Sequence, residues 1–485
     1  MITYQPMYLP IPVDFLYIWQ VIIDAGHDAL FVGGCIRDLI INEPVHDYDL
    51  ATSALPEQIM ELFPHVLPTG IQHGTVTVRH HGKSIEVTTF RLEKEYRDSR
   101  RPDSVNFISR VDEDLERRDF TCNSMAYRPD LGLLDLFDGL GDLKRRSLRT
   151  VGAAAARFGE DALRMLRAVR FCAQLDLMPE MSLLVAAELQ QDLIYRLSKE
   201  RIASEFSRTC GTRFLERLEA FAGTGVMRTS MAALGLEVAD EREMVWLLQR
   251  LLPGKENLLD LPPELNSAVG LLAVLLARRP VASAALTLEE SRLAVNIRAL
   301  RCSLVQDARF SAAVADQTAA LLLAVAALCE PSPDPEWVRA RLIAGRILLT
   351  CQLAADDARV TVVWASRLLC LLLGRDPSLD VSQNHGQRWQ GLPAWLNSAA
   401  CDALVDAAKT MQSNADLISV KELPVSGRDL INLGFSAGPQ LGDLLENLLM
   451  FAVRRPERPG RGQLLALAAS MAAENSSVPP VNGML

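Results

Sequence analysis

The sequence has 485 residues, of which 49% are hydrophobic and 23% are charged, a balance typical of a folded protein with about three domains. Its formal net charge of −10 argues against a protein that coats nucleic acid indiscriminately, although a local basic site is compatible with it. Neither secretion nor membrane insertion is expected. The N-terminus has no basic segment, and no apolar run approaches the about 20 residues of a membrane span.

The histidines and cysteines give no metal-binding or disulfide pattern. None of the seven histidines stands in an HxxxH or HExxH spacing, so we expect no zinc site. The nine cysteines are scattered and contain no CxxC pair. These features indicate reduced thiols in a cytoplasmic protein.

The first 150 residues combine short β-rich runs with turns. Residues 29–32 form an apolar run that ends at a glycine pair, and residues 75–79 and 84–90 alternate around a hairpin turn at 80–83. From about Ala153 onward the apolar spacing is helical, and Pro and Gly clusters divide this part. The pattern predicts a small head of strands and helices followed by a long helical region. The predicted domains are a head at 1–150, a neck at 151–215, a body at 216–375 and a tail at 376–485.

Residues Val32 to Asp38 predict a strand, the glycine pair Gly33-Gly34 and the start of a helix. Glycines allow backbone N–H groups to approach a phosphate closely, and a helix N-terminus favours negative charge. An ordinary tight turn is the alternative, because a glycine pair alone is a weak signal.

Three acidic residues fall in strand-like segments after the glycine pair. Asp47 and Asp49 are two positions apart, and in a strand such positions face the same side. Two adjacent carboxylates repel unless a cation lies between them, and magnesium prefers oxygen ligands. Glu86 is the single charge in an otherwise apolar strand, which makes it a candidate third carboxylate. The alternatives are an exposed acidic strand for the pair and a solvent-facing edge strand for Glu86.

Five blocks in order resemble the class II tRNA nucleotidyltransferases, the CCA-adding enzymes, and the related bacterial poly(A) polymerases. They lie within about residues 28–205 and are FVGGCIRDLIINEPVHDYDLATSA, which ends at Ala54, Glu116–Ala126, Asp138–Leu143, Glu160–Arg164 and Leu197–Ile202. The resemblance implies an α+β fold, with a nucleotidyltransferase-type mixed-sheet head followed by an all-α neck, body and tail. The basic GRRF-like segment typical of poly(A) polymerases is not found at Thr69–Val76, which favours a CCA-adding enzyme.

The resemblance also implies roles for residues in these blocks. Asp47 and Asp49 would hold two Mg²⁺ ions, and Glu86 would be a third catalytic acid. The nucleotide-binding residues that it implies are Gly33, Gly34, Arg37, Asp38, Arg118, Asp119, Asn123, Asp161, Arg164, Arg167 and Arg170.

Asp161 and Arg164 are expected at i and i+3 on one helix face. A carboxylate beside a guanidinium supplies an acceptor and a fork of donors, which match the edges of cytosine and adenine. Uracil and guanine would present a carbonyl to Asp161 instead. Without the other blocks, a solvated salt bridge would be the simpler interpretation of this Glu-Asp-x-x-Arg segment.

Two further segments resemble parts of the same family. Its flexible loop, which helps the switch from C to A addition, is similar to a segment containing Asp98, Arg100, Arg101, Pro102 and Asp103. A plain surface loop is the alternative there. Residues 425–442 resemble the tail segment with which bacterial members hold tRNA, and a helical packing element is the alternative.

These observations predict a cytoplasmic tRNA nucleotidyltransferase that adds CMP and AMP to the 3′ end of tRNA from CTP and ATP, releasing pyrophosphate. The alternatives are a specialist for A or CC addition, a poly(A) polymerase and a non-enzymatic RNA-binding relative. The expected partners are tRNA, ATP and CTP, without a membrane; the oligomeric state is left open. Residues 143–170 hold eight basic side chains and two acidic ones, so the overall negative charge leaves the neck locally positive.

Overall fold

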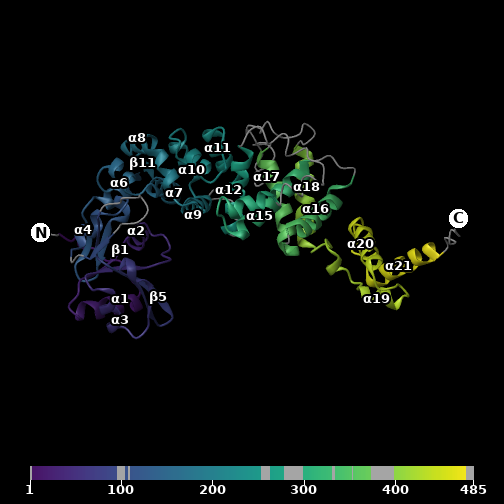
Figure 1. Cartoon of the computed structure of the whole chain (residues 1–485), viewed down its shortest axis with the longest axis horizontal. Helices are drawn as coiled ribbons and strands as arrows, with labels where there is room; N and C mark the ends of the chain where they lie inside the picture. The colour runs from purple at the N-terminus through teal and green to yellow at the C-terminus, as the bar shows by residue number, and fades with distance from the viewer. Residues whose placement is uncertain are drawn as a thin grey trace. The chain divides into compact units, whose positions relative to one another are not determined.

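The computed structural model describes residues 3–94, 104–107, 110–252, 263–277, 299–329, 334–351, 353–372 and 398–476. The chain divides into two compact units, Met1–Trp246 and Leu247–Leu485. The first unit contains the whole of the predicted head and neck (Figure 1). The finer division into head, neck, body and tail stays a prediction.

A seven-stranded mixed sheet lies at the centre of the head. Its strand order is β3-β4-β5-β2-β1-β8-β9, and β2 and β5 are parallel whereas the other neighbours are antiparallel. The strands are β1 (Ala29–Val32), β2 (Asp49–Thr52), β3 (Val66–Gly70), β4 (Thr75–His80), β5 (Lys83–Thr89), β8 (Met125–Arg128) and β9 (Gly132–Asp135). The predicted mixed-sheet head is therefore confirmed.

Strands β1, β4 and β5 lie where the apolar patterns predicted them. All four side chains of β1 are buried. In β5, Ile85 and Val87 are buried whereas Glu86 is exposed. Because successive side chains in a strand face opposite sides, this alternation places Glu86 on the open side of the sheet. β5 has neighbours on both sides, so Glu86 faces outward from an inner strand and not from an edge.

Helices surround the sheet and continue into the neck. Those of the first unit are α1 (Val13–Asp24), α2 (Gly34–Ile40), α3 (Pro56–Leu62), α4 (Val111–Glu116), α5 (Gly139–Arg145), α6 (Ala154–Glu160), α7 (Leu163–Leu175), α8 (Met181–Gln190), α9 (Lys199–Cys210) and α10 (Val226–Ala233), and the boundary between the units falls inside α11 (Glu241–Leu251). Four 3₁₀ helices join them: η1 (Ile71–His73), η2 (Thr121–Asn123), η3 (Gln191–Arg196) and η4 (Leu215–Phe221).

Two short strand pairs accompany these helices, and one of them places a two-residue strand in the otherwise helical neck. The pairs are β6 (Arg91–Lys94) with β7 (Ser104–Phe107), and β10 (Ser147–Leu148) with β11 (Met178–Pro179). α7 ends at Leu175, and the next residue, Asp176, takes a left-handed φ of 57° and turns the chain. β11 can then pair in parallel with β10, where the head meets the neck.

Both faces of the central strands are packed. On one face, Leu30 and Val32 of β1 cluster with Leu115 of α4. On the other, the Phe31 ring contacts Tyr48, whose ring also contacts Phe15 of α1. The sheet is therefore a fixed frame. Its register, with Phe31 opposite Leu50, brings the end of β1 and the start of β2 together, and the glycine pair and Asp49 lie there.

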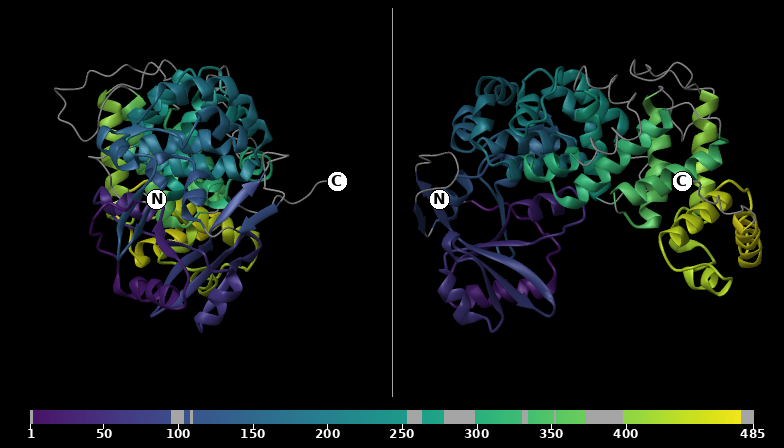
Figure 2. Two further views of the ribbon diagram at one scale, coloured as in Figure 1. Left: turned by 90° about the vertical axis from the view of Figure 1, so that its left-hand side faces the viewer. Right: turned by 45° about the vertical axis from the view of Figure 1, so that its right-hand side comes forward.

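The described residues of the second unit are helical. The helices are α12 (Pro263–Leu276), α15 (Ala312–Cys329), α16 (Glu336–Cys351), α17 (Ala355–Leu372), α18 (Ser398–Ser413), η6 (Val420–Glu422), α19 (Gly427–Asn432), α20 (Pro439–Val453) and α21 (Arg461–Ser476). Helices α15 to α18 pack against one another (Figure 2), and α19 to α21 share a separate apolar cluster around Leu430, Leu448 and Leu464. Of the described helices, none combines the length and the apolar character needed to cross a membrane.

Candidate active site

A cavity of about 660 Å³ opens between the sheet of the head and helix α7 of the neck. Its walls bring together segments that are far apart in the sequence. The predicted site residues that line it are Gly33, Gly34, Arg37, Asp49, Glu86, Arg118, Asp119, Asn123, Asp161, Arg164, Arg167 and Arg170. Asp38 and Asp47 were predicted for the same site but are not among its lining residues.

The glycine pair forms the tight turn from β1 into α2. Gly33 has a φ of 76°, and a Cβ added there would lie 2.9 Å from Nη1 of Arg118. A side chain at this position would therefore be strained and would displace the guanidinium. The turn holds open the space into which Arg118 reaches.

Asp49 and Glu86 are the two carboxylates of the sheet that face the cavity. They are register partners on the parallel strands β2 and β5. Burial, followed by the charge of Glu86, raises the pKa of Asp49 to about 6, against a smaller lowering by Arg118. A cation between these carboxylates would relieve their repulsion, and their oxygen donors suit a hard divalent metal.

Asp47 and Asp49 do not lie on one strand, contrary to the prediction from the sequence. β2 begins only at Asp49, so Asp47 lies in the irregular segment before the strand, where it is exposed. Its charge still contributes to the raised pKa of Asp49. In the described part of the chain, Asp47, Asp49 and Glu86 do not bring three ligand atoms within 4.8 Å of one another. The structure thus supports a carboxylate pair with a third acid nearby.

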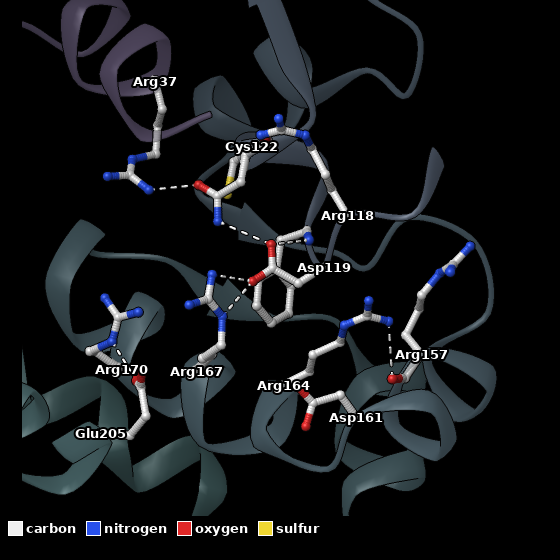
Figure 3. Close-up of polar contacts among 12 residues, drawn as sticks. Arg37, Arg118, Asp119, Cys122, Arg157, Asp161, Arg164, Arg167, Arg170 and Glu205 are labelled. Carbon is white, nitrogen blue, oxygen red and sulfur yellow. Dashed lines mark hydrogen bonds and ion pairs between the residues drawn. The ribbon is translucent and has the colours of Figure 1, made fainter. Parts of the chain in front are cut away.

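A buried hydrogen-bond network connects the head to α7. Arg37 donates to Oδ1 of Asn123 at 2.6 Å, and the amide of Asn123 donates to Oδ1 of Asp119 at 3.3 Å. Arg167 of α7 donates through Nε to Oδ2 of Asp119 at 2.7 Å (Figure 3). Figure 3 shows the guanidinium of Arg167 facing the carboxylate of Asp119. Asp38, which pairs with the Arg37 guanidinium at 2.7 Å, belongs to this network and not to the cavity wall.

Charge pairing keeps this network ionised. Burial opposes ionisation of Asp119, but the charge and hydrogen bond of Arg167 hold the pKa of Asp119 below its ordinary value. The pKa of Arg167 is correspondingly raised, against its own burial. A buried ion pair with satisfied hydrogen bonds is rigid, so the network fixes where the arginines of the cavity stand.

Asp161 and Arg164 do not lie on one continuous helix as predicted. Asp161 is the residue that ends α6, in extended conformation, and Arg164 is in the first turn of α7. Oδ2 of Asp161 accepts from Arg201 of α9 at 2.7 Å. Arg164 binds Glu160 and donates to the carbonyl of Arg117 at 2.8 Å. Both side chains still line the cavity, each held by a different partner.

Arg170 has partners that the sequence did not indicate. Its Nε donates to Glu205 of α9 at 2.7 Å, its guanidinium lies over the ring of Phe171, and Gln174 accepts from Nη1 at 2.8 Å. Gln174 could have been found from its i+4 spacing on α7. Glu205 could not, because only the packing of α7 on α9 brings it near.

The head supplies another unpredicted acid. Asp114 of α4 is buried, pairs with Arg117 at 2.7 Å and with Arg118 at 3.3 Å, and lines the cavity. Burial opposes its ionisation, yet the two arginines hold the pKa of Asp114 below its ordinary value.

The cavity as a whole is basic. Eight arginines and five carboxylates line it. Nε of Arg118 is buried and has no hydrogen-bond partner among the described residues. A basic cavity beside a carboxylate pair fits a polyphosphate that carries a divalent metal.

The predicted flexible loop, with Asp98, Arg100, Arg101, Pro102 and Asp103, lies outside the described residues. The tail segment at 425–442 is described, and α19 and α20 begin at its Gly427 and Pro439. Ser426 caps α19, accepting from the backbone N–H of Asp429.

Comparison with known proteins identifies the head. Residues 29–149 match the family described as poly A polymerase head domain. A CCA-adding enzyme of Lactobacillus delbrueckii subsp. bulgaricus is 50% identical over 204 residues, which cover 42% of this chain and 52% of that protein. One from Latilactobacillus sakei is 44% identical over 244 residues, 48% of this chain and 62% of that protein. The chain spans about half the length of the curated relatives it matches.

Solved structures resemble a larger part of the chain. The CCA-adding enzyme of Bacillus stearothermophilus in complex with CTP is 27% identical, has a TM-score of 0.61, and the likeness covers 96% of this chain and 98% of that one. The Thermotoga maritima CCA-adding enzyme complexed with tRNA is 17% identical with a TM-score of 0.56, over 94% of each chain. At that identity the second likeness supports the fold alone.

Proposed function

We propose that this chain, whose residues 29–149 match the poly A polymerase head domain family, is a tRNA nucleotidyltransferase that adds CMP and AMP to the 3′ end of tRNA. One observation carries the proposal: a single basic cavity contains the Asp49–Glu86 pair on the head and the Asp161–Arg164 pair on the neck. The first pair suits phosphoryl chemistry, and the second suits recognition of a base. The likeness to CCA-adding enzymes supports the same activity.

A divalent metal is implied by the family, and we propose Mg²⁺, as two ions. Asp49 and Glu86, with Asp47 beside them, are the residues that would hold it. When bound, the metal would activate the 3′-hydroxyl of the RNA and neutralise the leaving pyrophosphate.

The arginines of the cavity would bind the triphosphate and the sugar. Arg118 has a buried donor without a partner, and the Gly33 turn leaves space beside its guanidinium. Asn123, fixed between Arg37 and Asp119, is available to the sugar. Because these groups are held by one another before a ligand arrives, little reorganisation is needed on binding.

Base selection is proposed for Asp161 and Arg164. The carboxylate of Asp161 accepts a hydrogen bond from the exocyclic amino group of cytosine or adenine, and the guanidinium of Arg164 donates to the neighbouring acceptors. Uracil and guanine would place a carbonyl against Asp161. Arg201 fixes the carboxylate, so the pair can act as a template without a nucleic-acid strand.

The substrates would be CTP, ATP and tRNA, and a tRNA substrate suggests a cytoplasmic site of action. The tail segment at 425–442 and the loop at 98–103 are proposed to assist tRNA binding and the change from C to A.

The deciding experiment offers the purified protein tRNAs that end before CCA, after C and after CC, each with labelled CTP or ATP. Incorporation of CMP on the first two substrates and of AMP on the third is expected. Activity on the CC-ended tRNA alone would indicate an A-adding specialist, and CMP without AMP a CC-adding one. Long A tails would indicate a poly(A) polymerase. Asp49→Asn is the control, because a genuine product must disappear with the carboxylate.

A further inference from the structure

A second group of potential metal ligands lies in the head, away from the cavity. Asp14, His80 and His81 each offer a ligand atom, and these three atoms lie within 4.8 Å of one another. None of the three residues lines the candidate active site. No histidine spacing reveals this group, because His81 and Asp14 are 67 positions apart in the sequence.

Two features of the fold bring these side chains together. The β4–β5 hairpin turns through His81 and Gly82, whose φ angles are 47° and 78°. The left-handed turn lets the rings of His80 and His81 approach to 4.0 Å between centroids. Asp14, in the first turn of α1, then meets Nδ1 of His81 through Oδ1 at 3.0 Å.

Neighbouring side chains fix this arrangement. The ring of Tyr17, one turn after Asp14 on α1, stacks on His80 with 4.6 Å between centroids. Lys83 binds the other carboxylate oxygen of Asp14, at 2.7 Å, and its ammonium lies over the ring of Phe15. Oδ1 of Asp14 therefore remains beside the imidazoles while Oδ2 is neutralised by the lysine.

We propose that Asp14, His80 and His81 bind a divalent transition metal such as Zn²⁺ or Co²⁺. Two imidazoles and one carboxylate are a ligand set that such ions prefer over Mg²⁺. Metal–nitrogen distances of about 2.0–2.1 Å need ligand atoms a little over 3 Å apart, close to the 3.0 Å between His81 and Asp14. Solvent would complete the coordination, because His81 is exposed.

The bound ion would join the first turn of α1 to the tip of the β4–β5 hairpin. These segments now meet through the ion pairs of Asp14 with His81 and Lys83, the contact of Lys83 with the Phe15 ring and the Tyr17–His80 stack, and ion pairs at a surface contribute little to stability. A metal that binds only the folded arrangement stabilises it by mass action. The site is therefore structural, and it is independent of the proposed nucleotidyl transfer.

The test titrates untagged full-length protein with Co²⁺, followed by visible absorption, and with Zn²⁺, followed by calorimetry. Millimolar Mg²⁺ is present throughout to occupy the carboxylates of the active site. One equivalent is expected to bind, with a Co²⁺ spectrum of low coordination number and a rise in the melting temperature. Asp14→Asn and His81→Ala should each weaken the affinity at least about tenfold, as loss of a ligand requires.

His65→Ala is the matched control, because His65 lines the same surface cavity as His80 and His81 but is not in the ligand group. Its affinity for Co²⁺ should equal that of the unchanged protein. Circular dichroism and Mg²⁺-dependent nucleotide incorporation verify that every variant is folded. The proposal is overturned if the unchanged protein binds no stoichiometric Co²⁺, if both ligand variants retain the affinity, or if His65→Ala loses as much as they do.

Discussion

Burial and the neighbouring charge of Glu86 both disfavour the ionised form of Asp49. Its carboxylate is largely buried beside Glu86, and the pKa rises from its ordinary 3.8 to about 6. A raised carboxyl pKa means that the folded protein favours the protonated form. The resulting contribution to stability is fully present below pH 3.8 and is lost as the pH rises through about 6. The ionised site is thus destabilising until a cation binds.

This predicts a specific pH dependence for Asp49→Asn. Without divalent metal, the melting temperature of the unchanged protein should fall between about pH 4 and pH 6 more than that of the variant, whose amide does not titrate. At pH 7.5, Mg²⁺ should raise the melting temperature of the unchanged protein and have little effect on the variant. Thermal melts over pH, with and without Mg²⁺, measure both effects. Parallel pH curves for the two proteins would contradict the raised pKa.

Arg164 carries a prediction about base choice. Lysine keeps the charge but lacks the planar fork of donors, so Arg164→Lys should still bind triphosphate and select bases poorly. The preference for CTP over UTP, measured as a ratio of kcat/KM, should fall about 10- to 100-fold, the value of one or two hydrogen bonds. Arg213→Lys is the control, because Arg213 is a half-exposed partner of Glu43 outside the cavity. An unchanged ratio in Arg164→Lys would refute templating by this pair.

At the scale of elements, the turn from β1 into α2 connects the sheet to the cavity. A methyl group on Gly33 would meet Arg118 at 2.9 Å and would also sit on a backbone with a φ of 76°. Gly33→Ala should therefore cost about 1–2 kcal/mol of stability and weaken nucleotide binding by displacing Arg118.

Gly26→Ala separates these two effects. Gly26 has a comparable φ of 86°, but a Cβ there meets no atom within 4 Å. Its variant should lose similar stability in thermal melts while its KM for ATP stays the same. If both variants, or neither, raised the KM, the close approach between Gly33 and Arg118 would not matter for the nucleotide.

Some elements of the fold could be predicted from the sequence, and others could not. Alternation predicted β1 and β5 because burial on a sheet follows a period of two. The break between α6 and α7 was missed, since the residues around Asp161 form a continuous helical pattern without proline. At that break the Asp161 carboxylate accepts from the backbone N–H of Leu163 at 3.0 Å, a local contact at the start of α7, and also binds Arg201, 40 positions later. Local propensity carries no information about such a distant partner.

The family motifs predicted many of the residues that line the cavity. They did not predict two of the acidic residues that hold its arginines in position. Gly33, Asp119 and Arg167 were predicted because each belongs to a recognisable block. Asp114 and Glu205 are buried acids that neutralise the arginines, and neither has a sequence signal apart from its charge. Such partners are selected by packing, which a linear pattern does not encode.

At the scale of the whole molecule, charge is distributed unevenly. The chain carries −10 overall, yet arginines outnumber acids around the cavity. The boundary of the two units falls after Trp246, where the sequence shows no change of composition. Each unit has a buried core of its own, so we expect them to unfold separately.

Arg341 provides a test of that separation. It is buried in the second unit, where it pairs with Asp416 at 2.7 Å and donates to the carbonyls of Val453 and Arg455 at 3.1 and 2.6 Å. The Arg341 guanidinium thus joins α16 to the segment between α18 and η6 and to the C-terminal end of α20. Arg341→Ala leaves the Asp416 carboxylate and two carbonyls unpaired, which should cost about 3–5 kcal/mol.

Calorimetry of the full chain should show this loss in one transition only. ATP with Mg²⁺ is expected to shift the transition of the first unit, which contains the cavity, and Arg341→Ala should lower the other. Arg454→Ala is the matched control, because Arg454 is exposed and forms a long ion pair of 3.6 Å with Asp334; it should change neither transition. A fall of the ATP-sensitive transition in Arg341→Ala would show that the two units unfold as one. Separate transitions would mean that the second unit can lose order while the nucleotide site of the first remains intact.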